Sequence, residues 1–257
     1  MLKVENLSQN FGGITVLNDV SFTIERGEKV GLIGPNGAGK TTMINVLTGL
    51  LPAASGAVYF LGQNVTDMPA HKRVRLGMAR SFQKNTLFPD LSLLDNVRLA
   101  VQGTKSSRLQ MFRFINSYGN ILKDAELLLK LANLWEKRYA STAMLSHGEQ
   151  RQLEILLALA SKPKLLYMDE PSAGLTSAQT AGLMNRIRDL LGDTTLFFCA
   201  HDMDLVFSLA GRVMVLYYGQ IIAHGTPEEI RANSKVREIY LGSEDDDTAI
   251  KGRTHLL

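Results

Sequence analysis

The chain has 257 residues, 45% of them hydrophobic, which is enough for one large α/β domain or two small ones. Its 28 Lys and Arg residues barely exceed its 25 Asp and Glu residues, so we expect no nucleic-acid partner. The single cysteine, Cys199, excludes an internal disulfide and fits a reducing compartment. We find no secretory segment and no run of the roughly 20 apolar residues that span a bilayer. The sequence therefore predicts a cytoplasmic location, with any membrane association made through partners.

The first strong pattern is a strand, a glycine-rich loop and a helix. Residues 30–33 are a short apolar run, and residues 34–41 read GPNGAGKT. Apolar residues then recur at helical spacing at Met43, Ile44, Val46 and Leu47. The spacing Gly-x-x-x-x-Gly-Lys-Thr in this setting is the P-loop pattern that binds nucleotide phosphates.

Each part of the P-loop has a physical role. Small residues let backbone N–H groups surround the phosphates, Lys40 places an ammonium against the β- and γ-phosphates, and Thr41 offers a hydroxyl to Mg²⁺. A chance glycine-rich turn is the alternative, and the flanking strand and helix argue against it. We therefore expect ATP and Mg²⁺ as cofactors. The candidate nucleotide-binding residues are Gly34, Asn36, Gly37, Ala38, Gly39, Lys40, Thr41 and Thr42.

Two later apolar runs, residues 165–168 and Thr195–Cys199, are each followed by polar residues. Apolar spacing in Ser177–Leu191 predicts a crossover helix between them, so the runs read as parallel strands whose carboxyl ends share one sheet edge. At that edge Asp169 could hold Mg²⁺ through water, and Glu170 could polarise an attacking water. Many strands end in solvated carboxylates, but the P-loop upstream favours the catalytic interpretation.

The remaining segments outline the domain. Residues 93–160 contain no convincing strand and predict an inserted helical subdomain, with helices at 125–134 and 148–160. Residues 213–218 and 221–224 flank a predicted hairpin turn at Gly219 and Gln220, and Thr226, Pro227 and Glu229 form a helix start with a capping box. We expect one domain over residues 1–242 and a mobile tail over residues 243–257.

Residues 145–150 read LSHGEQ and permit two compatible interpretations. Ser146 and Glu149 are spaced as a capping box for the helix that follows. Gly148 would also let a phosphate approach the N–H groups at that helix start.

The order of the P-loop, Gln83, LSHGEQ, Asp169-Glu170 and His201 resembles the nucleotide-binding subunit of an ABC transporter, over about residues 2–242. The resemblance implies an α/β fold with a P-loop NTPase core of the ABC ATPase type, an inserted helical subdomain and a small β subdomain. It also implies that Ser146 and Gly148 bind the γ-phosphate held by a second subunit's P-loop, in a head-to-tail dimer.

Three further roles follow from the same resemblance. Phe11 would stack on adenine, although an isolated Phe is more often part of a core. Gln83 would sense Mg²⁺ and water and contact the membrane subunit, and His201 would contact the γ-phosphate; without the family they would pass for surface and structural residues. The implied partners are a second ABC ATPase subunit, identical or paralogous, and transmembrane permease subunits docked on residues 84–94. The implied location is peripheral, on the inner face of the cell membrane.

The chain departs from the common family pattern at a few positions. His147 and Glu149 replace the usual Gly and Gln, and Thr176 stands where many members carry Asp. A threonine hydroxyl can form a hydrogen bond across a dimer but supplies no charge. Glu170 is present, which implies an active ATPase.

Four segments suggest a subfamily: NFGG at 10–13, ARSFQ at 79–83, LSHGEQ at 145–150 and EIYLG at 238–242. Together they resemble the ATPases of importers for branched-chain amino acids and urea, and residues 146–152 lean slightly toward urea or a short-chain amide. The alternatives are the ATPase of an exporter or lipid transporter, and a soluble ABC-type switch protein. Switch proteins commonly fuse two such domains or insert a long coiled coil, and neither feature is seen in these residues.

Overall fold

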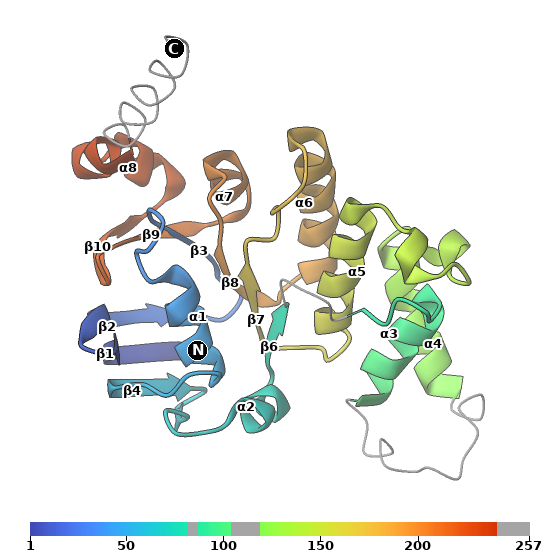
Figure 1. Ribbon diagram of the computed structural model, residues 1–257. Helices are drawn as coiled ribbons and strands as arrows, with labels where there is room; N and C mark the ends of the chain where they lie inside the picture. Colours follow the sequence, from blue (N-terminus) through green and yellow to red (C-terminus); the bar gives the residue numbers. More distant parts are fainter. Residues whose placement is uncertain (82–86, 104–118, 241–257) are drawn as a thin grey trace, which may run out of the picture.

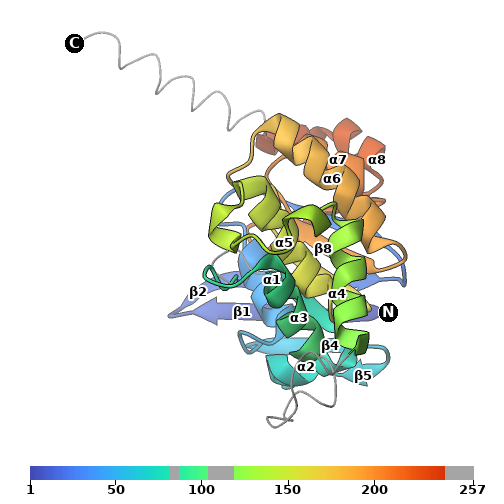
Figure 2. The same ribbon diagram turned by 90° about the vertical axis from the view of Figure 1, so that its right-hand side faces the viewer.

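The computed structural model describes residues 1–81, 87–103 and 119–240, and it contains two sheets and a group of helices at one side (Figures 1 and 2). The α/β class predicted from the sequence is confirmed. Gln83 and the predicted tail at 243–257 lie outside the described residues, as do residues 84–86 of the predicted docking segment.

The central sheet has six strands. In sheet order they are β10 (Gln220–Gly225), β9 (Arg212–Tyr217), β3 (Lys29–Ile33), β8 (Thr195–Cys199), β7 (Leu165–Asp169) and β6 (Met78–Ser81). All neighbours pair in parallel except β10, which is antiparallel to β9. Strands β7 and β8 are buried along their whole length, as their apolar sequences predict. Strand β6, with the mixed sequence MARS, was not predicted.

A second, antiparallel sheet forms the small β subdomain. Its strands, in order, are β2 (Ile14–Ile24), β1 (Leu2–Phe11), β4 (Ser55–Phe60) and β5 (Gln63–Asn64). Helix α1 (Lys40–Thr48) lies between this sheet and the central one (Figure 1). One apolar cluster joins the three layers, and it includes Leu2, Met43 and Tyr167. The β subdomain therefore packs against the back of the P-loop helix.

The other face of the central sheet is covered by helices. They are α6 (Ser177–Leu191) and α7 (Met203–Leu209), with α8 (Pro227–Ala232) beside β10, while α2 (Ala70–Leu76) precedes β6. Helix α6 has the predicted bounds. The predicted capping box of α8 is confirmed: the Thr226 hydroxyl accepts from the Glu229 N–H, and Glu229 accepts from the Thr226 N–H at 2.8 Å. The hairpin turns at Tyr218 and Gly219, whose φ angles are 43° and 76°, one residue earlier than predicted.

The helical subdomain has its own apolar cluster. Its helices are α3 (Leu93–Gly103), α4 (Gly119–Leu131) and α5 (His147–Leu159), with short 3₁₀ turns at Trp135–Lys137 and Thr142–Met144. Helix α4 ends three residues before the predicted 134, because Asn133 takes a left-handed conformation with φ 53°. Helix α5 contributes Leu153 to this cluster and Ile155 to the core cluster, so it joins the two parts. Within the described chain, no helix has the length and apolar character needed to cross a membrane.

Candidate functional site

The P-loop lies between β3 and α1, and its backbone depends on two glycines. A Cβ at Gly34 would lie 2.2 Å from the Leu216 carbonyl oxygen, and one at Gly39 would lie 2.8 Å from the Val16 carbonyl oxygen. Gly39 also has φ 106°, which disfavours any other residue. Asn36, Gly37 and Thr41 are exposed, while Ala38 is buried behind them. The loop therefore packs closely on its inner side and is open on the outer side.

Lys40 is held inside this loop. Its ammonium donates hydrogen bonds to the Gly34 carbonyl at 2.8 Å and to the Pro35 carbonyl at 3.0 Å, and the residue is 7% exposed. Burial lowers the pKa of Lys40, and the carboxylates of Glu170 and Asp169 oppose this shift. The loop thus holds a cation at the start of α1, where the helix dipole and free N–H groups favour an anionic ligand such as phosphate.

Asp169 lies at the carboxyl end of β7 and is 1% exposed. Burial raises its pKa, while the nearby Arg80 guanidinium and a hydrogen bond from the Thr41 hydroxyl lower it. The structure thus brings together Asp169 and Thr41, both predicted to bind Mg²⁺. Mg²⁺ prefers oxygen ligands and is usually held by one or two carboxylates, water and substrate phosphates. The Asp169 carboxylate and the Thr41 hydroxyl are oxygen donors of this kind, and among the described residues no group of three or more His, Cys, Asp or Glu could hold a metal ion.

Glu170 and His201 come from adjacent strand ends and contact each other. His201 Nε2 lies 2.8 Å from Glu170 Oε1. Glu170 has φ 46°, a left-handed conformation that costs a non-glycine residue roughly 1–2 kcal/mol. Its N–H donates to the Cys199 carbonyl at 2.8 Å, which ties this backbone to β8. Both side chains are partly exposed, so the carboxylate can reach a ligand.

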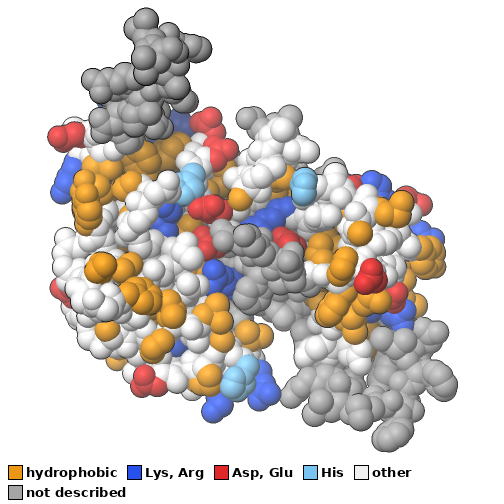
Figure 3. All heavy atoms as spheres, in the orientation of Figure 1, with side chains coloured by type: hydrophobic (Ala, Val, Ile, Leu, Met, Phe, Trp, Pro, Cys, Tyr) orange, Lys and Arg blue, Asp and Glu red, His pale blue; other side chains and the backbone are white. Residues whose placement is uncertain are grey.

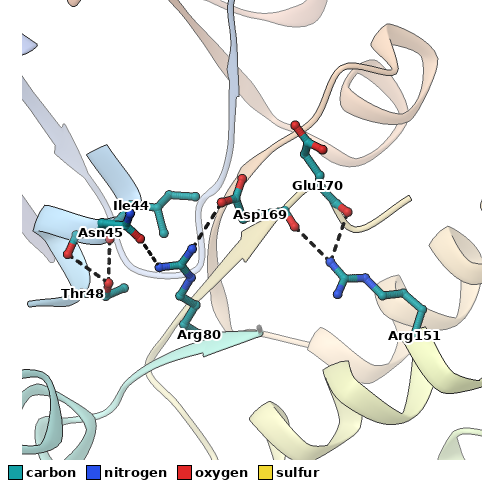
Figure 4. Close-up of polar contacts among 7 residues, drawn as sticks. All are labelled: Ile44, Asn45, Thr48, Arg80, Arg151, Asp169 and Glu170. Carbon is teal, nitrogen blue, oxygen red and sulfur yellow. Dashed lines mark hydrogen bonds and ion pairs between the residues drawn. The ribbon is translucent and has the colours of Figure 1, made fainter. Parts of the chain in front are cut away.

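Two arginines that the sequence analysis did not consider surround the acidic pair (Figure 4). Arg80, on β6, bonds to Asp169 Oδ2 at 3.3 Å and to the Asn45 amide oxygen on α1. Arg151, on α5, donates to the backbone carbonyls of Asp169 at 3.0 Å and Glu170 at 3.1 Å. The sequence indicated them only by position: Arg80 lies within ARSFQ, and Arg151 directly follows LSHGEQ.

Ser146 and Gly148 occupy the start of α5. The predicted capping box is present: the Ser146 hydroxyl accepts from the Glu149 N–H at 3.4 Å, and Glu149 accepts from the Ser146 N–H at 3.1 Å. Glu149 also pairs with Lys137. A Cβ at Gly148 would meet nothing nearer than Leu175 at 4.0 Å, so this helix start is open. None of the hydrogen bonds found in the described chain joins Ser146 or Gly148 to the P-loop.

Phe11, Tyr240 and Thr176 lie on three further segments of the chain. Phe11, at the end of β1, is 44% exposed, so it is not a core residue and its ring is free to stack. Tyr240 accepts a hydrogen bond from the Gly34 backbone, and burial raises its pKa to about 12. Thr176 caps α6 by accepting from the Gln179 N–H at 3.4 Å. The C-terminal segment at Tyr240 therefore touches the start of the P-loop.

Charged side chains gather in the middle of one face, between the α/β core and the helical subdomain (Figure 3). A P-loop before α1 and an acidic pair at a nearby strand end define an α/β P-loop nucleotide-binding protein. The ABC transporter family profile matches residues 17–173, and the C-terminal profile of branched-chain amino acid ATP-binding cassette transporters matches residues 220–246. The chain belongs to the ABC transporter family and is its ATP-hydrolysing cassette subunit.

Relatives of similar length support this assignment. The chain is 35% identical to the high-affinity branched-chain amino acid transport ATP-binding protein LivG of Salmonella typhimurium, covering 94% of this chain and 98% of LivG. It is 34% identical to a probable LivG of Archaeoglobus fulgidus, covering 96% and 97%. The ADP conformation of MJ1267, an ATP-binding cassette of an ABC transporter, has a TM-score of 0.83 at 29% identity, covering 94% and 98%. The dimeric post-hydrolysis structure of MJ0796, bound to ADP and phosphate, has a TM-score of 0.73 at 26% identity, covering 88% and 99%.

Proposed function

We propose that this chain is the ATPase subunit of an importer of branched-chain amino acids. The observation that carries the proposal is the match of residues 220–246 to the C-terminal profile of that transporter class, beside relatives of that class matched over nearly their whole length. Urea and short-chain amides, toward which residues 146–152 lean, stay an alternative prediction. In either case the membrane subunits, and not this chain, recognise the transported molecule.

The nucleotide site is shared between two subunits in this proposal. Lys40 and Thr41 hold one face of ATP, and Ser146 and Gly148 of a second subunit close the other face. The open start of α5 supports this division. The dimer of the relative MJ0796 supports it as well. Phe11 stacks on the adenine ring.

The catalytic roles follow from the strand-end geometry. Thr41 and Asp169 would hold Mg²⁺, which when bound would supply positive charge that stabilises the phosphates. Glu170 accepts a hydrogen bond from the attacking water and draws off its proton. His201, which already contacts the Glu170 carboxylate, orients that side chain and reaches toward the γ-phosphate. Gln83 acts at the water and the metal, as the family resemblance implies.

A groove at the edge of the core is the proposed docking site for the permease. Its volume is about 520 Å³, and it lies among α1, α2, β6, α3 and α5. Several of its lining side chains are apolar yet exposed: Leu50, Val74, Phe88 and Leu99. Such a patch marks a protein interaction site, and Phe88 belongs to the docking segment predicted from the sequence. We assign an apolar segment of the membrane subunit to it.

The test is to purify the chain from detergent-solubilised membranes with its partners and reconstitute the complex in vesicles. We expect ATP-dependent uptake of labelled leucine, isoleucine or valine, and ATPase turnover that rises when the substrate is supplied. Uptake of labelled urea or acetamide, with no uptake of the three amino acids, would overturn the substrate assignment. Recovery of the chain without any membrane protein would overturn the transport role.

A further inference from the structure

The groove contains two charged side chains in an otherwise largely apolar lining. Among its described lining residues, Arg80 and Glu154 carry charge. Both are largely buried, with side-chain exposures of 11% for Arg80 and 12% for Glu154. A charge buried in an apolar wall is costly unless it is paired, so the partners of these two residues indicate why they are there.

The partner of Glu154 is Arg151, one turn earlier on α5, at 2.7 Å. The Arg151 side chain is 8% exposed, and its guanidinium also donates to three successive backbone carbonyls: Asp169 at 3.0 Å, Glu170 at 3.1 Å and Pro171 at 3.1 Å. A planar guanidinium with five fixed donors suits such a set of acceptors, and a lysine does not. Arg151 therefore holds in place, by hydrogen bonds, the backbone that carries the proposed catalytic carboxylate.

One of these hydrogen bonds is made to a residue with a strained backbone. Glu170 has φ 46°, and such a conformation persists only where the surrounding structure holds it. Figure 4 shows Arg151 on one side of this backbone and the Glu170 carboxylate on the other. Movement of the guanidinium would thus change where the carboxylate lies relative to the attacking water.

The partner of Arg80 is Asp169, at 3.3 Å, together with Asn45 on the P-loop helix (Figure 4). Arg80 thus links the groove to the carboxylate that fits Mg²⁺. The two arginines connect one groove to both acidic residues of the site, by separate routes: Glu154 and Arg151 to Glu170, and Arg80 to Asp169.

We propose that Arg151 and Arg80 are positioning residues that transmit occupancy of the groove to the catalytic carboxylates. The transmission rests on the proposed docking of the permease in this groove, where the incoming segment meets Glu154 and Arg80. Neither arginine contacts the reacting atoms in this proposal. Arg151 fixes the position of the Glu170 backbone. Arg80 fixes the position of the Asp169 carboxylate relative to α1.

The Arg151 route is tested with Arg151→Lys, Arg151→Met and Glu154→Gln in the reconstituted complex. Misplacing a catalytic group by about 1 Å can cost on the order of 100-fold in rate, so we expect Arg151→Lys to lower kcat by about 10-fold to 100-fold. The KM for ATP and the affinity for the nucleotide should change less than about twofold, because the arginine touches Glu170 only through its backbone. Glu154→Gln should reduce the stimulation of turnover by the permease while the complex still assembles.

The Arg80 route has a readout that does not depend on turnover. In Arg80→Lys, titration of Mg²⁺ against the ATP-bound subunit should show metal affinity reduced by about 10-fold, as for other groups that hold a metal-binding carboxylate. Binding of metal-free ATP should stay unchanged.

Leu99→Ala is the matched control, because Leu99 lines the groove and has no hydrogen-bonding side chain to join either arginine. It should weaken permease binding without changing Mg²⁺ affinity. Unchanged permease binding in Leu99→Ala would overturn the docking site alone. Folded Arg151→Lys and Glu154→Gln variants with normal kcat and normal stimulation would overturn the positioning proposal; these conservative variants decide the matter if Arg151→Met fails to fold.

Discussion

The two sides of the nucleotide site are built in contrasting ways. The P-loop side consists of consecutive residues, 34–42, which we propose bind phosphate mainly through backbone N–H groups and Lys40. The opposite side combines Asp169 at the end of β7, Glu170 directly after it, His201 just beyond β8, Arg80 from β6 and Arg151 from α5. The proposed phosphate-binding loop is therefore local in the chain, while the geometry of the proposed catalytic residues depends on tertiary packing.

The difference also appears in where strain is held. On the P-loop side the unusual backbone is taken by glycine at Gly39, which adopts φ 106° without steric cost. On the other side the left-handed position is taken by a glutamate, Glu170, with φ 46°. Two hydrogen bonds hold that conformation: the Glu170 N–H donates to the Cys199 carbonyl, and Arg151 donates to the Glu170 carbonyl. Four substitutions test how separate the two sides are.

The largest effect is expected from Glu170→Gln. Removing a general base typically lowers the rate by about 10²-fold to 10⁴-fold, and the amide keeps the shape of the side chain. Turnover of the assembled complex should nearly cease while ATP binding persists. Glu228→Gln, an exposed substitution on α8, is the control. Ordinary turnover in Glu170→Gln would remove Glu170 from the catalytic role.

Lys40→Ala should weaken nucleotide binding at the P-loop side of the site. A hydrogen bond to a charged group contributes about 1.5–3 kcal/mol, so ATP affinity should fall roughly 10-fold to 150-fold. Equilibrium binding of a fluorescent ATP analogue measures this loss. The pair sharpens the comparison, because Lys40→Ala should impair binding and Glu170→Gln should impair turnover alone. Equal affinity in Lys40→Ala and the natural chain would contradict the assigned role.

Gly34→Ala tests whether the P-loop backbone tolerates a side chain. The added Cβ would lie 2.2 Å from the Leu216 carbonyl oxygen, so the backbone must shift, at a cost of about 1–3 kcal/mol of unfolding free energy. Gly148→Ala is the control, since its Cβ meets only open space and alanine favours a helix by about 0.5–1 kcal/mol. Thermal unfolding should therefore move in opposite directions in the two variants. Equal melting temperatures would show that the loop relaxes freely.

The smallest effect is expected from Glu149→Gln. Glutamine preserves the capping bond but loses the pairing with Lys137, and a partly exposed pair contributes about 0.2–1 kcal/mol. The pKa of Glu149 is lowered, mainly by the hydrogen bond from Lys137. The stabilisation is therefore present above the unfolded value, about pH 4.3, and fades as the pH falls through the lower folded value. Denaturant unfolding at pH 7 and pH 3.5 measures the difference, and a gap that does not narrow between the two would refute this origin.

Much of the core was predictable from short-range pattern. The strands at 165–168 and Thr195–Cys199, the helix Ser177–Leu191 and the capping boxes at Ser146 and Thr226 follow from apolar periodicity and cap residues, and all are present. The strands of the antiparallel sheet were not located, because β1 and β2 pair through register shifts that blur their alternation. Strand β6 was missed because four mixed residues give no periodic signal.

The sequence by itself determined the P-loop, the acidic strand end and the family, because each is carried by residues close together in the chain. The tertiary structure decided which side chains surround the acidic pair. Arg80 and Asp169 are 89 positions apart in the sequence, and Arg151 and Asp169 are 18 positions apart. Such contacts depend on how β6 and α5 pack against β7, and the secondary-structure propensities of these segments do not predict that packing. The groove that joins them exists only once those elements are folded together.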